Sequence, residues 1–293
     1  MIKKYSLQTQ GILLALFAML TFSINDGIFK YSLRAFPLET VIFIGYFFSL
    51  LFLGAYGYWQ KISFLPAQKW KGIIAGLLFL AEQTLFVYAL KHLPITELFI
   101  VVLCTPVFVL IMAHIFLKEH LRRQEIHAVI LGFCGALIVT CAPLATDSDS
   151  SQSNYNALAW AAAFLNVVAG GTKILFLRKY CQEENAFSLS FISILAVTVF
   201  YLMIIKSNPI DMPGFDLMLL FFGGGIGAAG CIAYIRAFQK TKAALVSATQ
   251  YSQIIWAVLM GIFIFEENLN FVAICGSALI LMSGYFLYLR EKV

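Results

Sequence analysis

The sequence predicts an all-α, polytopic membrane protein whose chain crosses the bilayer ten times. Ten apolar stretches fill most of the 293 residues, and each is close to the about 20 apolar residues that a membrane-spanning helix needs. The chain is 61% hydrophobic and only 12% charged, with a mean hydropathy of +0.87, whereas about a quarter of the residues in soluble domains are charged. Lysine and arginine also gather in alternate gaps between the stretches, as membrane topology demands.

The ten expected helices cover residues 10–31, 38–58, 71–91, 95–117, 126–144, 157–177, 187–206, 216–238, 243–265 and 270–289. The first stretch follows two lysines, as a secretory signal does. It lacks a small-residue cleavage site and continues into Asn25 and Asp26, so we expect it to be the first helix. The longest polar gap, residues 142–156, is predicted to be a linker, and the gaps leave no room for a separate soluble domain.

The distribution of basic residues predicts that both termini are cytoplasmic, in the inner membrane of a bacterium. With the N-terminus inside, fourteen basic residues fall on inner segments and four on outer segments. The inner set is Lys3, Lys4, Lys61, Lys69, Lys71, Lys118, Arg122, Arg123, Arg178, Lys179, Lys240, Lys242, Arg290 and Lys292, and the outer set is Lys30, Arg34, Lys91 and Lys206. The net charge of +5 therefore reflects topology, and no basic patch indicates nucleic-acid binding.

The chain also contains a weak internal repeat. A shift of 147 residues places Glu119 on Glu266 and superposes most predicted helix boundaries. We expect a first repeat over 1–144, a periplasmic linker over 145–156 and a second repeat over 157–293. Each repeat holds five helices, an odd number, so the second copy must be inverted in the membrane. Inverted repeats are typical of transporters, which rock about a central site to open it to either side.

Charged residues inside the predicted spans are the first candidates for function. A charge at mid-membrane costs at least about 2.5–3.5 kcal/mol, so it requires a partner, water or a role. Asp26 either pairs with Lys30 near the outer surface or lies in the substrate or proton pathway, where Asn25 adds a second polar group. Glu82, beside Gln83, is either a proton-coupling carboxylate or a hydrogen-bonded core residue, since nothing nearby in sequence neutralises it.

The same repeat relates a lysine to one of these carboxylates. The 147-residue shift equates Lys173 with Asp26, so the two opposite charges are expected to pair across a cavity unless Lys173 extends to the inner surface. Glu97, two residues past the start of the fourth helix beyond Pro94, is more consistent with a charge at a helix N-terminus than with a ligand.

The ninth predicted helix carries uncharged polar and aromatic candidates. Gln250 and Gln253 share a helix face, which Trp256 extends, and Tyr251 lies beside them. This set suits a cavity for a small metabolite, including a cation held by aromatic rings, although hydrogen bonds between helices would also explain it. Weaker candidates for substrate binding are Tyr46, Gln83 and Asn166.

Several sequence features argue against other classes of protein, such as enzymes, metalloproteins and ATP-driven pumps. Gly225 to Gly230 match the G-x-G-x-x-G dinucleotide fingerprint but lie in an apolar helix without a preceding strand, so close helix packing explains them better. The six cysteines have no metal-ligand spacing and are expected to be reduced core residues. No motif indicates a catalytic residue, a metal site or a cofactor, and no nucleotide-binding loop indicates an ATP-driven pump.

Paired motifs in the two halves resemble the EamA-like branch of the drug/metabolite transporter superfamily. The first half contains Tyr88 to Pro94, Thr105 to Phe108 and Phe116 to Glu119, and the second contains Tyr251 to Ala257 and Phe265-Glu266. The resemblance implies two inverted five-helix repeats that move metabolites across a bacterial inner membrane. Asn25-Asp26 with Lys30-Tyr31 is similar to the first helix of bacterial S-adenosylmethionine uptake transporters, although the arginine that those proteins often carry in the second helix is absent here.

We therefore expect a secondary transporter, not an enzyme, for a small polar metabolite that is amino-acid-like or nucleoside-like. The candidate binding residues are Asn25, Asp26, Tyr46, Gln83, Asn166, Lys173, Tyr251, Gln253 and Trp256, and the candidate proton-coupling residues are Asp26 and Glu82. The alternatives are S-adenosylmethionine uptake by antiport and, from another class, a membrane scaffold or intramembrane enzyme. The expected partners are the metabolite and the lipid bilayer, and both a monomer and a homodimer remain open.

Overall fold

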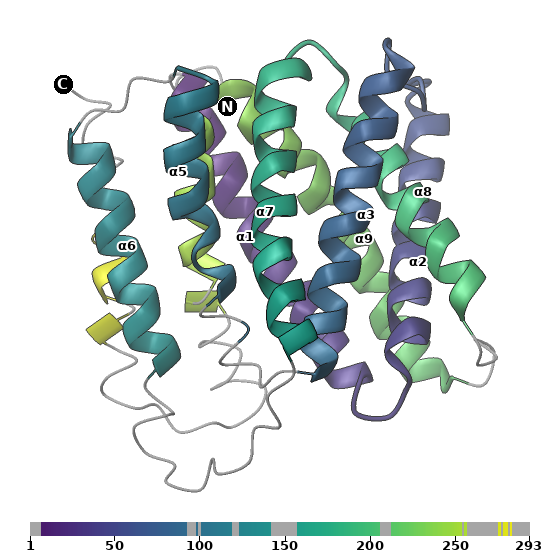
Figure 1. The fold of residues 1–293 in the computed structure, drawn as a ribbon. Coiled ribbons are helices and arrows are strands. Elements are labelled where there is room, and N and C mark those ends of the chain that lie inside the picture. Colours follow the sequence, from purple (N-terminus) through teal and green to yellow (C-terminus); the bar gives the residue numbers. More distant parts are fainter. Residues whose placement is uncertain are drawn as a thin grey trace, which may run out of the picture.

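The computed structural model describes residues 7–92, 98, 101–118, 123–141, 157–205, 212–253, 255–256, 275–276, 278–280 and 282, and every regular element in this part of the chain is helical (Figure 1). The helices are α1 (Leu7–Ser32), α2 (Leu38–Trp59), α3 (Lys69–His92), α5 (Thr105–Phe116), α6 (Arg123–Cys141), α7 (Ala157–Tyr180), α8 (Ala186–Ile204), α9 (Gly214–Lys240), α10 (Ala243–Ala248) and the short 3-10 helix η4 (Thr249–Tyr251).

Six of these helices are long and apolar enough to cross a bilayer, namely α1, α2, α3, α7, α8 and α9. Large apolar side chains also lie exposed on the outside of the bundle, among them Leu165, Leu202 and Phe222. A helix that is apolar on its outer as well as its inner face suits a lipid environment. The all-helical membrane class is confirmed. The count of ten spans is not, because much of the last two predicted helices falls outside the described residues.

The predicted fourth and ninth helices are interrupted. Where one helix was expected over 95–117, a turn at Leu103 and Cys104 precedes α5, and the Cys104 amide donates to the Val101 carbonyl at 3.0 Å. Pro106, which lacks an amide proton, stands in the first turn of α5 and favours a helix start there. Where one helix was expected over 243–265, α10 gives way to η4 after only six residues. Each of these two predicted spans therefore departs locally from α-helical geometry, with described helical residues on both sides of the departure.

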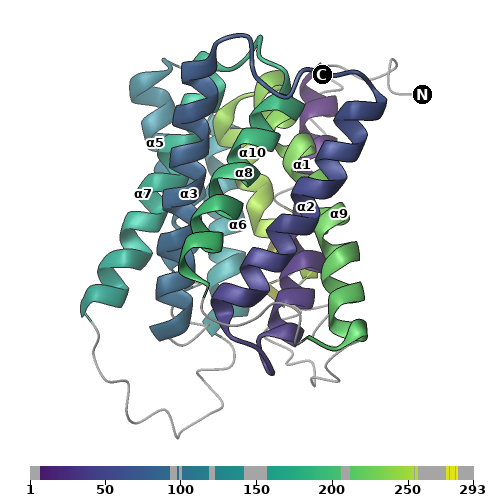
Figure 2. The same cartoon turned by 90° about the vertical axis from the view of Figure 1, so that its right-hand side faces the viewer.

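Small residues let α9 approach α1 and α2 closely, and these contacts join the two halves of the chain. A methyl group added to Gly224 would come within 2.8 Å of the Ser49 nitrogen and 3.0 Å of the Gly45 carbonyl, so the backbones of α9 and α2 touch. Gly230 lies against the side chain of Thr21 on α1, where an added methyl group would also clash. The interpretation of the Gly225–Gly230 motif as a helix-packing surface is confirmed. Helix α8 completes this side of the bundle and packs against both α2 and α3 (Figure 2).

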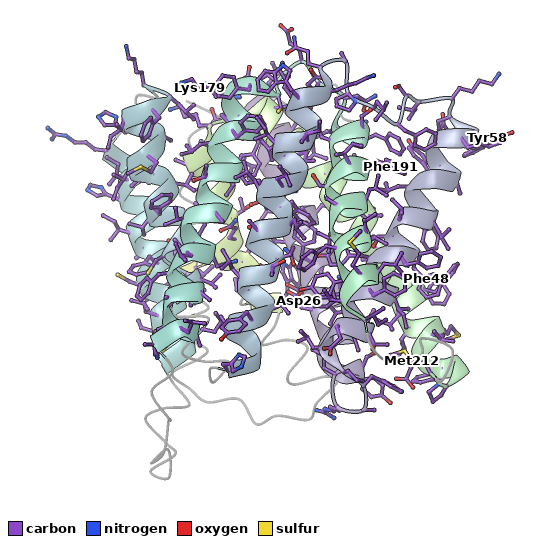
Figure 3. All side chains as sticks on the ribbon, turned by 45° about the vertical axis from the view of Figure 1, so that its right-hand side comes forward. Asp26, Phe48, Tyr58, Lys179, Phe191 and Met212 are labelled. Carbon is purple, nitrogen blue, oxygen red and sulfur yellow. The ribbon has the colours of Figure 1, made fainter. Side chains whose placement is uncertain are left out.

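Side chains from both halves also hold one end of the bundle together. Arg178 donates to the Phe238 carbonyl at 3.1 Å, and Lys240 donates to Gln10 at 2.7 Å. Figure 3 shows Lys179 and Tyr58 at this end and Met212 toward the other, with Asp26 at a level between them. Arg178, Lys179 and Lys240, which the sequence assigns to the inner side, thus lie at one end of the bundle, which we call the inner end.

Candidate functional site

Asp26 is an accessible carboxylate on a membrane-spanning helix. It lies in the lower half of α1, and Figure 3 places it within the bundle rather than at either end. Its side chain is exposed, and its Oδ2 accepts a hydrogen bond of 2.7 Å from Gln253 Nε2. Ser23 helps to fix that partner, because its hydroxyl donates to the Gln253 carbonyl at 3.3 Å. Within the described residues, Asp26 therefore has a neutral partner and no cation.

Glu82 on α3 and Lys173 on α7 form an ion pair. The Lys173 side chain is only 8% exposed and that of Glu82 is 21% exposed. Asn166, about two helical turns before Lys173, donates to the Glu82 backbone carbonyl at 2.8 Å. Gly170 leaves room for the carboxylate, since a methyl group there would lie 2.6 Å from Glu82 Oε1. No residue nearby in sequence neutralises Glu82, and the lysine that does so comes from another helix.

Aromatic rings surround the buried ammonium of Lys173. Its Nζ lies 4.9 Å from the ring centroid of Phe79 and 5.8 Å from that of Tyr234. The Tyr234 hydroxyl accepts a hydrogen bond of 2.7 Å from Gln250, which fixes the ring. Tyr46 packs edge-on against Phe79 at 6.1 Å between centroids. Such ring faces attract cations, so the surroundings stabilise a positive charge at this place.

The two polar pairs belong to different groups of helices. Glu82 and Lys173 join α3 and α7, which pack together with α5, whereas Asp26 and Gln253 join α1 to the segment after η4, beside α9 and α10. Tyr46 on α2 packs against Phe29, three residues after Asp26 on α1, and against Phe79, whose ring centroid is 4.9 Å from Lys173 Nζ, so Tyr46 lies between the two pairs. The expected pairing of Lys173 with Asp26 is not what the structure contains, since Lys173 binds Glu82.

The remaining candidates, Asn25, Tyr251 and Trp256, each have a buried polar atom, and they lie in different surroundings. Asn25 points its side chain at α9, where a methyl group on Gly223 would lie 2.9 Å from its Oδ1. Buried polar atoms without a hydrogen-bond partner in the described part of the chain include Asn25 Oδ1, Trp256 Nε1 and the Tyr251 hydroxyl. Tyr251 is only 1% exposed and packs in an apolar cluster, away from Gln253. A contact between Tyr251 and cargo stays a prediction.

Some predicted contacts cannot be compared with the structure, and others were missed. Gln83 is half-buried beside Glu82, and its role stays a prediction. The side chain of Lys30, as well as Glu97, Glu119, Glu266 and the linker, lies outside the described residues. The aromatic residues Phe79 and Tyr234 were not recognised as site residues, because aromatic residues make up 15% of the chain and carry no distinctive spacing. The adjacent glycines Gly170 and Gly171 were the available signal for a close approach.

The interruptions in the fourth and ninth helices are related by the internal repeat. Adding the 147-residue shift to the turn at 103–104 gives 250–251, within η4. Gln253, the partner of Asp26, is the second residue after the end of η4. Interrupted helices at corresponding positions of two repeats are characteristic of binding sites in secondary transporters, because they free backbone groups and create points of bending.

Comparison with known proteins agrees with this geometry. The model of the EamA-like transporter family matches the chain twice, over residues 9–141 and 157–289. The S-adenosylmethionine uptake transporter of Rickettsia conorii is 26% identical over 96% of this chain and 93% of its own length. The pseudopaline exporter of Pseudomonas aeruginosa is 22% identical over 96% of this chain and 97% of its own length. A crystal structure with 15% identity superposes with a TM-score of 0.76 over 97% of this chain and 99% of its own, and it supports the fold alone.

Proposed function

The chain belongs to the EamA-like transporter family, and we propose that it is a secondary transporter for a small organic metabolite that carries a positive charge. As a member of this family it is a multi-pass membrane protein, and its relatives are transporters rather than enzymes. The observation that carries the proposal is Asp26, an accessible carboxylate in a membrane helix whose described partner is a neutral amide.

The charge of the site favours a cationic cargo. Glu82, Lys173 and Asp26 together carry one net negative charge when all three are ionised, because Lys173 neutralises only Glu82. A carboxylate at membrane depth is costly without a counter-ion. A cargo with one net positive charge supplies this counter-ion, whereas an anionic cargo would increase the net negative charge of the site. The nearby rings of Tyr46, Phe79 and Tyr234 add faces that favour cations.

S-adenosylmethionine fits these requirements and is the cargo to test first. It carries an ammonium group, a sulfonium group and a carboxylate, so its net charge is positive. Four relatives of 25–26% identity from Rickettsia species are named as its uptake transporters. The relative named as a pseudopaline exporter supports the broader class of small organic cargo and leaves the direction of transport open.

The proposed mechanism is alternating access between two inverted repeats, residues 1–144 and 157–293, in the inner membrane of a bacterium with both termini cytoplasmic. The inner end is closed in this structure by contacts between the halves, such as those of Lys240 with Gln10 and of Glu184 with Ala67. We propose that Asp26, Gln253 and Tyr46 contact cargo and that Asp26 is the first candidate for proton coupling, because Glu82 already has Lys173 as its counter-ion.

The test is uptake of radiolabelled S-adenosylmethionine into proteoliposomes. Loss of a charge-assisted contact is worth about 1.5–3 kcal/mol, so Asp26→Asn should weaken apparent affinity by about 10- to 100-fold. Glu183→Gln is the matched control, since it removes an exposed carboxylate far from the site. Gln253→Ala should weaken binding less, because it removes a neutral partner. Uptake that is equal in Asp26→Asn and wild type would refute the role of this carboxylate.

Proton coupling is tested by the pH dependence of the same uptake. Glu82→Gln that leaves both the rate and its pH dependence unchanged would exclude Glu82 from coupling. A lack of wild-type uptake for S-adenosylmethionine, with a thermal shift for another small organic cation, would keep the cationic class and change the cargo.

A further inference from the structure

The ammonium of Lys173 occupies a site built for an organic cation. Its three described neighbours are the carboxylate of Glu82 and the ring faces of Phe79 and Tyr234, at 4.9 and 5.8 Å from the ring centroids. A carboxylate combined with aromatic faces is a general solution for binding ammonium and sulfonium groups. The lysine therefore fills, from within the protein, a position with the chemistry of a ligand site.

The fixed part of this site is the carboxylate, and the movable part is the lysine. Asn166 holds the backbone of Glu82 with a hydrogen bond of 2.8 Å, and Gly170 lets the carboxylate lie directly against α7. Lysine carries its charge on a flexible four-carbon stem and binds as a point charge without fixed direction. The Glu82 side chain is more exposed than that of Lys173, 21% against 8%, so the carboxylate belongs to the less enclosed partner of the pair.

We infer that Lys173 is a tethered cation, which holds in the cargo-free carrier the place that the cationic group of the cargo takes between Glu82, Phe79 and Tyr234. This inference rests on the proposed function, because the exchange requires a cationic cargo. When the cargo enters, its cation pairs with Glu82 and displaces the ammonium of Lys173.

The tethered cation, Lys173, allows the cargo-free carrier to change between its two open states. A carboxylate that passes through an occluded state without a counter-ion is strongly disfavoured. Lys173 keeps Glu82 neutralised when no cargo is present, so the empty carrier can change state. Removal of the tether should therefore impair the return of the empty carrier and spare the exchange of one cargo molecule for another.

The first experiment tests the cation site without any assumption about natural cargo. Lys173→Ala vacates the site, and trimethylsulfonium, a small permanent cation, is added to the purified protein in a thermal-unfolding assay. It should raise the melting temperature of Lys173→Ala by several degrees and leave wild type unchanged. The double variant Lys173→Ala with Glu82→Gln should lose the response. Lys240→Ala, which removes a lysine bound to Gln10 at the inner end, should behave as wild type.

An equal response of wild type and Lys173→Ala, or a response that persists with Glu82→Gln, would overturn the inference. If Lys173→Ala does not fold, Lys173→Met preserves most of the side-chain packing without the charge and is read in the same way.

The second experiment separates net uptake from exchange, with radiolabelled S-adenosylmethionine in proteoliposomes. Lys173→Gln should exchange external for internal cargo at close to the wild-type rate, while uptake into cargo-free vesicles falls at least about tenfold, because Glu82 is then unpaired in the empty carrier. Loss of both modes would make Lys173 an ordinary cargo contact, and unchanged net uptake would make it dispensable. Either result overturns the inference that Lys173 is a tethered cation. Inactive wild type in both modes contradicts the proposed cargo instead, and the trimethylsulfonium response then decides the inference alone.

Discussion

Replacement of Glu184 by glutamine is expected to loosen the inner end of the bundle and to favour its opening. Glu184 lies between α7 and α8, and the residue is 6% exposed. Its Oε2 accepts from the Ala67 amide at 2.8 Å, and its Oε1 accepts from the Gln68 amide at 3.3 Å and lies 3.4 Å from Lys71 Nζ. The carboxylate thus joins the second half of the chain to the loop before α3 in the first half. We call these four residues the inner clasp.

The size of the effect follows from the contacts that glutamine cannot replace. The amide oxygen of glutamine still accepts from Ala67, but the second acceptor for Gln68 and the charge opposite Lys71 are lost. Hydrogen bonds to charged groups are worth about 1.5–3 kcal/mol, and solvent reaches part of this pair, so a loss of about 2 kcal/mol is expected. If the inner clasp forms only when the inner end is closed, the same free energy shifts the ratio of closed to open carrier by about 30-fold.

Cys181 provides a reporter for this opening. The residue is fully buried, and burial raises the pKa of its thiol to about 12, so the group is both covered and protonated at pH 8. Maleimides react with the thiolate, so Cys181 should label very slowly while the inner clasp is closed. Opening exposes the thiol to water and returns its pKa toward the ordinary value, which increases labelling. The assay uses a variant in which the other five cysteines are replaced.

The expected result is faster labelling in Glu184→Gln together with a lower melting temperature. Glu183→Gln is the matched control, because the neighbouring carboxylate is exposed and should change neither quantity. Labelling at the wild-type rate in Glu184→Gln, with reduced thermal stability, would refute the gating role and leave a static contact. No change in either quantity would show that the contact contributes nothing measurable.

Three further substitutions test the packing that positions the site. Gly224→Ala should lower the free energy of unfolding by about 1–3 kcal/mol in a thermal melt, because the new methyl group meets the α2 backbone at 2.8 Å. Gly54→Ala is the control and should not destabilise the protein, because the space around Gly54 is open. Gly170→Ala should leave the melting temperature nearly unchanged but reduce uptake by about tenfold or more, since the methyl group displaces the Glu82 carboxylate; normal uptake would mean that the carboxylate position is unimportant. Asn185→Ala should cost about 1 kcal/mol of stability, measured in the same melt, because Asn185 caps α8 by accepting from the Phe187 amide at 2.9 Å.

Hydropathy predicted the long helices well because a membrane-spanning helix needs about 20 consecutive apolar residues. Each helix meets this requirement through its own sequence, independently of its neighbours. The expected spans 38–58, 157–177 and 187–206 agree with α2, α7 and α8 within a few residues. The interruption before α5 could not be predicted in this way, because a turn inside an apolar stretch changes backbone hydrogen bonds without changing composition. Pro106 was the local signal, and the weight of the surrounding apolar residues concealed it.

The site was predicted at the level of residues but not of partners. Asp26, Glu82 and Lys173 stand out in the sequence because a charge inside an apolar helix demands an explanation. Which charges form ion pairs depends on which helix faces lie against each other. The 147-residue shift of the internal repeat alone predicted Asp26 as the partner of Lys173. The structure pairs Lys173 with Glu82, since α3 and α7 lie side by side and Gly170 admits the carboxylate.

The internal repeat relates positions whose charges are opposite, and this difference bears on the transport cycle. Asp26 and Lys173 correspond under the 147-residue shift, yet the first binds a neutral amide and the second binds a carboxylate. Inverted repeats can exchange their shapes when the carrier changes state, but they cannot exchange their charges. Among the described residues, one wall of the site therefore keeps a carboxylate whose partner is neutral, while the other keeps a neutralised pair. For a zwitterionic cation, Asp26 gives the positive group a place to bind that does not compete with Lys173, and displacement of Lys173 from Glu82 becomes a later and separable step.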